Sequence, residues 1–276
     1  PDFVFRPLRD QANLKPIRIY LDGYKFHQNS TKSDSEKRMA IWKKQDSYVW
    51  TLAWEDLPTP NKDLDTSIVE WLTQGANSQS VGLHDQICNK AQRPTYNQLT
   101  STVEKGPLDW LMSYLRGNEA NSSLLSQAAF SRLFGFLNFQ STPQQQEDVA
   151  KTAAATSPEE WFHDHFVGDI ISNAVQVSTA KQLQLSVATP KQALKSLDVL
   201  TQLCAINLYI DDTDYENESF HQVWRMFWAA TNLLQFIPFH TMVTQRGLDD
   251  SCYDDLLIKP VTETAGDKKW NSREWD

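Results

Sequence analysis

Three short runs of β-branched and aromatic residues, with one helical segment between the second and the third, dominate the start of this chain. The runs lie at residues 3–5, 18–21 and 49–53, and the second ends in an Asp-Gly pair that is typical of turns. Residues 33–36 read Ser-Asp-Ser-Glu, a capping box in which two side chains satisfy free backbone N–H groups, so a helix is expected to start near Ser33. This order of strand, strand, helix and strand predicts a compact α/β unit.

The remainder of the chain has a different pattern. Residues 58–106 are rich in Pro, Asn, Gln and Ser, which indicates a connector, whereas apolar residues at helical spacing predict helices within 107–170 and at 218–237. Alternating or β-branched runs predict strands at 183–187 and 203–210, and no internal repeat is evident. We therefore predict an α+β chain with three parts, which are an α/β module at 1–57, a connector at 58–106 and a mainly helical region with a few strands at 107–276.

Charge and composition limit the possible partners. The 276 residues carry 26 Lys and Arg against 35 Asp and Glu, a net charge of −9, yet residues 1–60 hold ten basic and eight acidic residues. A basic segment inside an acidic chain can face nucleic acid, although the chain as a whole cannot do so by net charge. No apolar run approaches the length of a membrane span, and three widely spaced cysteines suggest neither a disulfide framework nor a zinc site, so we expect a cytoplasmic protein. Because the sequence starts with Pro1, we interpret it as a piece of a longer chain.

Two carboxylates and a histidine form the most informative group of polar residues. Asp2 and Asp22 lie at the edges of two expected neighbouring strands, where they can converge on one divalent cation such as Mg²⁺ or Mn²⁺. His27 follows Asp22 by five residues and can take or give a proton near such a metal. The pattern predicts a metal site made by Asp2 and Asp22, with His27 beside it.

These residues resemble a known family. The segments Pro-Asp-Phe-Val-Phe at 1–5, Tyr-Leu-Asp-Gly-Tyr-Lys-Phe-His at 20–27 and Tyr-Val-Trp-Thr-Leu-Ala-Trp-Glu at 48–55 resemble the very-short-patch mismatch-repair endonuclease branch of the PD-(D/E)XK nuclease fold. The resemblance covers about 57 of the 276 residues. It implies a restriction-endonuclease-like fold in which Asp2 is the principal metal ligand, His27 the general base and Asp34 the acidic residue that orients the histidine.

The chain departs from that family at two positions. The mismatch enzymes carry His where Asp22 stands, and a related branch reads Glu-x-Asp-Gly with the Glu as a metal ligand. The corresponding position here is Tyr20, and a phenol is a poor ligand for Mg²⁺. Two functions therefore remain open: a metal-dependent DNA endonuclease, or a catalytically inactive nuclease fold that binds DNA or a partner subunit inside a helicase assembly. A third option is a purely structural scaffold, which predicts no DNA affinity and no metal.

A second resemblance extends the first. The phrase Ile-Tyr-Leu-Asp-Gly-Tyr-Lys-Phe-His and the aromatic helix at 220–239 resemble the C-terminal region of very large bacterial DEAD/DEAH-box helicases, some of which are encoded in phage-defence loci. This resemblance implies a helicase motor as partner, with the ATPase lying outside this chain, since the sequence holds no Gly-x-x-x-x-Gly-Lys-Ser/Thr loop. DNA is the other expected partner, and its phosphates are expected to contact five basic side chains, Lys25, Lys37, Arg38, Lys43 and Lys44.

Overall fold

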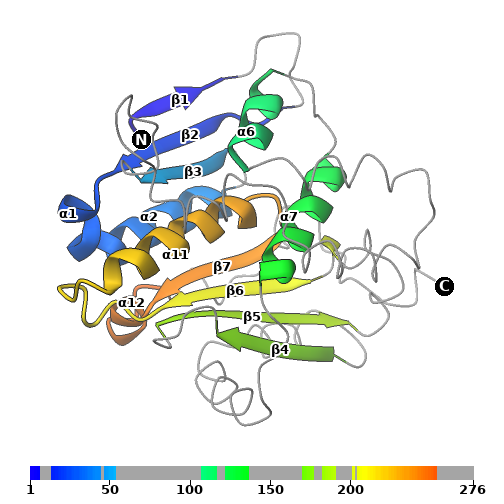
Figure 1. Ribbon diagram of the computed structural model, residues 1–276. Coiled ribbons are helices and arrows are strands. Elements are labelled where there is room, and N and C mark those ends of the chain that lie inside the picture. Colours follow the sequence, from blue (N-terminus) through cyan, green and yellow to red (C-terminus); the bar gives the residue numbers. More distant parts are fainter. Residues whose placement is uncertain are drawn as a thin grey trace.

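Two β-sheets with helices between them make up this mixed α+β protein (Figure 1). The computed structural model describes residues 1–6, 14–44, 47–53, 107–116, 122–136, 170–176, 182–190, 201–202 and 204–253. The predicted connector at 58–106 lies outside the described residues.

The first sheet contains the three predicted strands in the order β1-β2-β3. Strand β1 (Phe3–Phe5) runs antiparallel to β2 (Ile17–Asp22), and β2 runs parallel to β3 (Tyr48–Ala53). The chain passes from β2 to β3 through α1 (Tyr24–His27), the short 3-10 helix η2 (Gln28–Ser30) and α2 (Thr31–Lys43). The strand predictions are confirmed to within one residue at each end.

The predicted start of α2 is wrong by two residues. The helix begins at Thr31 because η2 runs directly into it, and the Ser33 hydroxyl donates to the Ser30 carbonyl at 3.1 Å. A serine inside a helix can donate in this way to a backbone carbonyl three or four residues earlier. The capping-box pattern at 33–36 therefore lies inside the first two turns of the helix and not at its start.

The second sheet has four strands in the order β4-β5-β6-β7. Strands β5 (Leu183–Pro190) and β6 (Ala205–Ile210) were expected, whereas β4 (Ile170–Gln176) and β7 (Phe239–Thr244) were not. Strand β6 connects to its parallel neighbour β7 through α11 (Phe220–Leu234). The order of an antiparallel pair followed by a parallel crossover thus occurs twice, as β1-β2-α2-β3 and as β5-β6-α11-β7, although the sequence shows no repeat.

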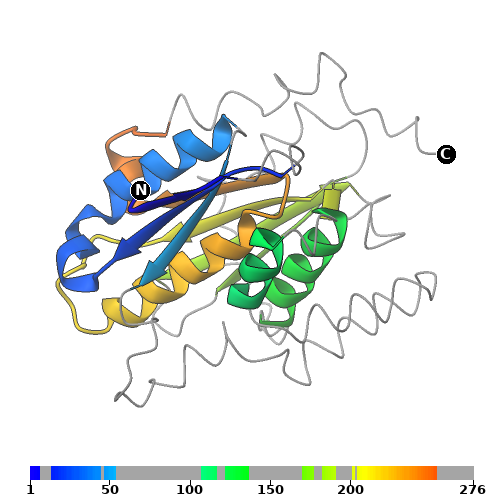
Figure 2. The same ribbon diagram turned by 90° about the horizontal axis from the view of Figure 1, so that it is seen from above.

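The two crossover helices lie between the sheets, and each of them packs against strands of both sheets. Helix α11 packs against β3 of the first sheet as well as β6, and α2 packs against β7 of the second sheet as well as β3. Both sides of α11 are therefore covered, and Trp224 and Trp228 are fully buried. Helices α6 (Pro107–Leu115) and α7 (Ser122–Phe136) lie in the range 107–170 that was predicted to be mainly helical, of which residues 117–121 and 137–169 lie outside the described part. Helix α7 packs beside α11 (Figure 2). One apolar core joins residues of both sheets and these helices.

Side chains of α11 complete the free edge of β3. The Thr51 N–H donates to Asn232 Oδ1 at 2.8 Å, and Asn232 Nδ2 donates to the Thr51 carbonyl at 2.6 Å. The Val49 N–H donates to Gln235 Oε1 at 3.0 Å. Alternate residues of a strand direct their backbone groups to the same edge, so the two amides substitute for a neighbouring strand. Within the described part of the chain, no helix is long and apolar enough to cross a membrane.

Candidate metal and proton-transfer site

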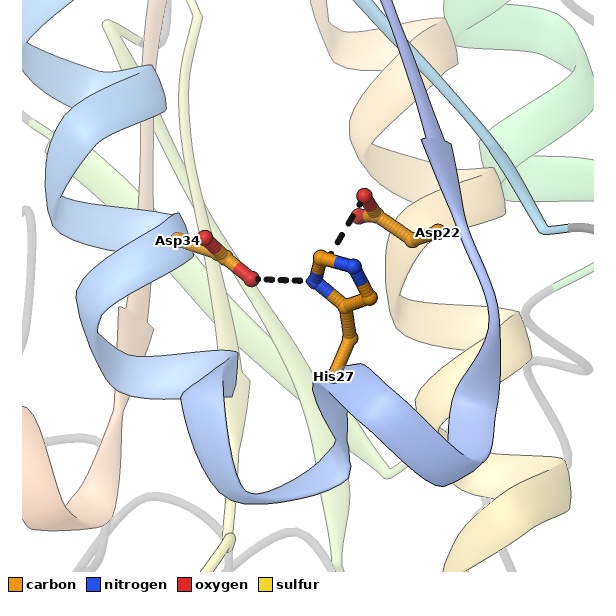
Figure 3. A group of neighbouring side chains, drawn as sticks. All are labelled: Asp22, His27 and Asp34. Atoms are coloured by element: carbon orange, nitrogen blue, oxygen red, sulfur yellow. Dashed lines mark hydrogen bonds and ion pairs between the residues drawn. The ribbon is translucent and has the colours of Figure 1, made fainter.

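Asp22, His27 and Asp34 come together where the chain leaves β2 (Figure 3). Asp22 is the last residue of β2, His27 ends α1, and Asp34 lies in the first turn of α2. His27 Nδ1 lies 2.9 Å from Asp34 Oδ2 and 3.6 Å from Asp22 Oδ1. The short α1–η2 segment turns the chain back over the strand end, so residues within a stretch of thirteen share one site.

Burial differs among the three side chains. Asp22 is 2% exposed, Asp34 is 13% exposed and His27 is 34% exposed. An ionised carboxylate only accepts hydrogen bonds, so Nδ1 of His27 donates to Asp34 and leaves Nε2 as the nitrogen able to accept a proton. The site therefore combines a buried carboxylate with a partly exposed imidazole.

Arg38 holds the second oxygen of Asp22 in a buried ion pair that the sequence did not predict. Arg38 Nη2 donates to Asp22 Oδ2, and the guanidinium lies 4.6 Å from the Tyr20 ring centroid and 4.0 Å from that of Trp228. The Arg38 side chain is only 1% exposed. The expectation that Arg38 contacts DNA phosphates is therefore wrong, because the helix face that carries it packs into the protein.

Tyr20 lies on β2 two residues before Asp22, and its ring faces the guanidinium of Arg38. Burial raises the pKa of the Tyr20 phenol, against the opposing effect of the nearby Arg38 charge. The phenol stays protonated at neutral pH, and a neutral phenol is no substitute for a carboxylate at a hard cation. Its ring serves as one of the two aromatic surfaces around Arg38.

Asp2 lies at the same end of the first sheet but outside the three-residue cluster. Its Oδ2 accepts from the Leu21 N–H at 2.8 Å, and its own N–H donates to the Ile19 carbonyl at 2.9 Å. The ligand atoms of Asp22, His27 and Asp34 all lie within 4.8 Å of one another, and Asp2 is not among them. The structure thus places the predicted ligand Asp2 beside the residue that precedes Asp22, exposed to solvent.

Four of the five predicted DNA contacts are accessible to different degrees. Lys25 and Lys44 are exposed, Lys43 is half-buried, and Lys37 is 67% exposed with Nζ 3.7 Å from Asp34 Oδ1. Lys37 of α2 and Lys44, the C-cap residue that follows α2, are seven residues apart and so lie on about the same side of the helix. Phe26, which precedes His27, is 85% exposed.

The ligand atoms of the cluster allow a limited test of whether a divalent cation fits it. One ligand atom each from Asp22, His27 and Asp34 lies within 4.8 Å of the other two. Because Nδ1 of His27 donates to Asp34, a cation at this cluster would be held by carboxylate oxygens, which suit Mg²⁺ and Mn²⁺.

Comparison with protein-family models, curated proteins and solved structures finds no match for this chain. The geometry of the described residues is therefore what supports a function. Sequence reasoning found His27, Asp34 and Asp22 but missed the pairing of Asp22 with Arg38. No local sequence signal marks this pairing, because Arg38 stands beside Lys37 and its burial depends on the distant residue Trp228.

Proposed function

We propose that this chain carries a divalent-metal-dependent nuclease site at the Asp22–His27–Asp34 cluster. The observation that supports it is the imidazole of His27 held by Asp34 at 2.9 Å, with a second carboxylate 3.6 Å away and partial access to solvent. A histidine fixed at one nitrogen by a carboxylate is an efficient proton-transfer group, because its other nitrogen is correctly placed and basic.

Each residue of the cluster has a separate task in this proposal. Asp22, together with Asp2 at the same strand end, would hold the metal, whose role is to polarise a phosphodiester oxygen and acidify a bound water. His27 accepts the proton of the attacking water at Nε2. Asp34 keeps the imidazole in one orientation and stabilises its protonated form.

The surroundings of the site support nucleic acid as the substrate. Lys25 and Lys37 flank the histidine on α1 and α2, and both side chains are exposed. Phe26 presents an exposed ring next to His27, and bases stack on such rings irrespective of their sequence. The resemblance to the C-terminal region of bacterial helicases supports the further proposal that the site acts on DNA delivered by a motor outside this chain, in a repair or phage-defence assembly.

Cleavage assays with variants of the full chain test the nuclease. Single-stranded and duplex DNA are incubated with Mn²⁺, Mg²⁺ or EDTA, and product is quantified for the parent, His27→Ala, Asp34→Asn and Asp2→Ala. We expect metal-dependent cleavage, a loss of roughly two to four orders of magnitude for His27→Ala, and loss of activity for Asp2→Ala. Glu216→Gln, the same carboxylate-to-amide change as Asp34→Asn but at an exposed position, is the matched control. Cleavage by His27→Ala or Asp2→Ala at the parent rate would refute the assignment.

The buried Arg38–Asp22 pair favours a second candidate, a catalytically inactive nuclease fold that binds DNA. A guanidinium that already neutralises Asp22 removes much of the reason for a metal to bind there. This candidate predicts DNA binding without cleavage under any metal. Binding would weaken, and the salt dependence of log K would flatten by about two phosphate contacts, in Lys37→Gln combined with Lys44→Gln. Unchanged affinity and salt slope in that double variant would exclude the DNA-binding surface on α2.

A further inference from the structure

Residues about 200 positions away hold the segment that carries His27. Arg246 of α12 (Gln245–Asp249) donates from Nη1 to Asn29 Oδ1 at 3.1 Å and from Nη2 to the Asn29 carbonyl at 2.9 Å. Asn29 is the central residue of η2 and follows His27 by two residues. Both terminal nitrogens of the Arg246 guanidinium therefore bind the turn between His27 and α2.

A buried carboxylate fixes Arg246 in turn. Asp212 is 0% exposed, and its two oxygens accept from Arg246 Nε at 3.0 Å and from the Arg246 backbone N–H at 2.9 Å. The Tyr215 ring lies under the guanidinium, with its centroid 4.6 Å from Cζ. A guanidinium that is paired, stacked and held through its own backbone has little freedom left, so its contacts to Asn29 are well defined.

Three further contacts attach the same segment to the same distant region. The Tyr24 hydroxyl donates to the Tyr215 carbonyl at 3.2 Å, and the Tyr24 ring stacks on His221 with centroids 4.2 Å apart. Lys32, at the start of α2, forms an ion pair with Asp250. Tyr24, Asn29 and Lys32 span the segment from one side of His27 to the other, so its path depends on residues 212–250.

We propose that Arg246, held by Asp212, is a positioning residue for His27. It holds η2 so that Nδ1 of His27 stays within hydrogen-bonding distance of Asp34, which leaves Nε2 for the proton transfer. The proposal deepens the nuclease function and rests on it for its effect on catalysis, but its structural part concerns only the orientation of one imidazole. Of the residues described above, Arg246 donates hydrogen bonds only to Asn29 and Asp212. It does not take part in the proton transfer.

The test replaces the guanidinium of Arg246 by an ammonium group, which keeps the positive charge but not the paired N–H donors. Arg246→Lys preserves a cation beside Asp212, so no buried carboxylate is left unpaired, but an ammonium cannot reach both oxygens of Asn29 with fork geometry. Arg116→Lys, at an exposed position after α6, is the matched control. Should Arg246→Lys fail to fold, Asn29→Ala removes one arm of the clamp from an exposed position and takes its place.

The readouts are the imidazole nitrogen resonances of His27 in the full chain and the pH profile of DNA cleavage. We expect one dominant tautomer in the parent and in Arg116→Lys, and a mixture of tautomers in Arg246→Lys. We expect kcat to fall about tenfold or more, with KM for DNA nearly unchanged, since a small misplacement of a catalytic group costs this much. Unchanged His27 resonances in both folded variants would overturn the proposal. Altered resonances without cleavage by any protein, the parent included, would uphold the clamp while refuting the nuclease.

Discussion

Replacing Asn232 by leucine removes both hydrogen bonds that α11 makes to Thr51. The change keeps the size of the side chain, so the effect is limited to the two backbone groups it leaves behind. Thr51 is 2% exposed and Asn232 is 6% exposed, so water has little access to the freed N–H and C=O. Each unpaired buried backbone group costs about 1–3 kcal/mol. We therefore expect the free energy of unfolding to fall by about 2–5 kcal/mol, a large part of the 5–15 kcal/mol that is typical of whole domains.

Urea unfolding followed by tryptophan fluorescence measures this loss, and amide hydrogen exchange locates it. Gln235→Leu is the graded control, because the one β3 backbone group that it frees is the Val49 N–H, apart from losing a long 3.4 Å bond from Gln235 Nε2 to the Thr231 carbonyl. It should cost about half as much, roughly 1–3 kcal/mol. The Thr51 amide should exchange faster in Asn232→Leu than in Gln235→Leu. A change below about 0.5 kcal/mol in Asn232→Leu, with unchanged exchange at Thr51, would show that α11 does not substitute for a strand at the edge of β3.

Three further predictions concern packing and pH. Gly247→Ala should displace the buried Tyr253 ring, because a Cβ at position 247 would lie 2.4–2.6 Å from Tyr253 atoms, and the loss of stability by thermal unfolding should exceed 1 kcal/mol. Trp224→Ala should cost about 3–5 kcal/mol in chemical unfolding, since the side chain is 0% exposed. Burial lowers the pKa of His240 from 6.5 to about 4, so the unfolded chain binds the extra proton first and acidification favours unfolding. Stability should fall by about 2 kcal/mol between pH 7 and pH 5, and His240→Gln should remove that part of the pH dependence.

Local patterns were sufficient to predict most strands of the described chain and α11, but not where these elements pack. The strands β2 and β3 are marked by β-branched and aromatic residues, which favour extended chain wherever they occur. Strand β7 was missed because His240, Thr241 and Thr244 interrupt its apolar residues. Its polar positions are satisfied by partners that only the tertiary structure brings near, such as Asn207 for the Thr241 hydroxyl at 2.7 Å.

The candidate site likewise contains residues whose grouping local patterns predict and one residue, Arg38, whose contacts they do not. His27 and Asp34 are close in sequence, and the motif that joins them to Asp22 could be read directly. The burial of Arg38 could not be predicted in this way, because Arg38 stands beside Lys37 in a basic stretch that is typical of a solvated helix face. Its burial depends on Trp228, a residue of α11 that lies 190 positions further along the chain. No local pattern contains that information.

Residues 1–57 hold every member of the candidate site, but contacts from residues outside this range determine how these members are arranged. The inner face of α2 carries Met39 and Trp42, which are 2% and 7% exposed because β7 and its neighbours cover them. Without the second sheet this face and the guanidinium of Arg38 would meet water, and the Arg38–Asp22 pair would lose the low-polarity surroundings that strengthen it. The turn at Asn29 would lose both bonds from Arg246 as well. The placement of His27 beside Asp22 and Asp34 is therefore a property of both sheets together, and the second sheet belongs to the site as much as the strand on which Asp22 lies.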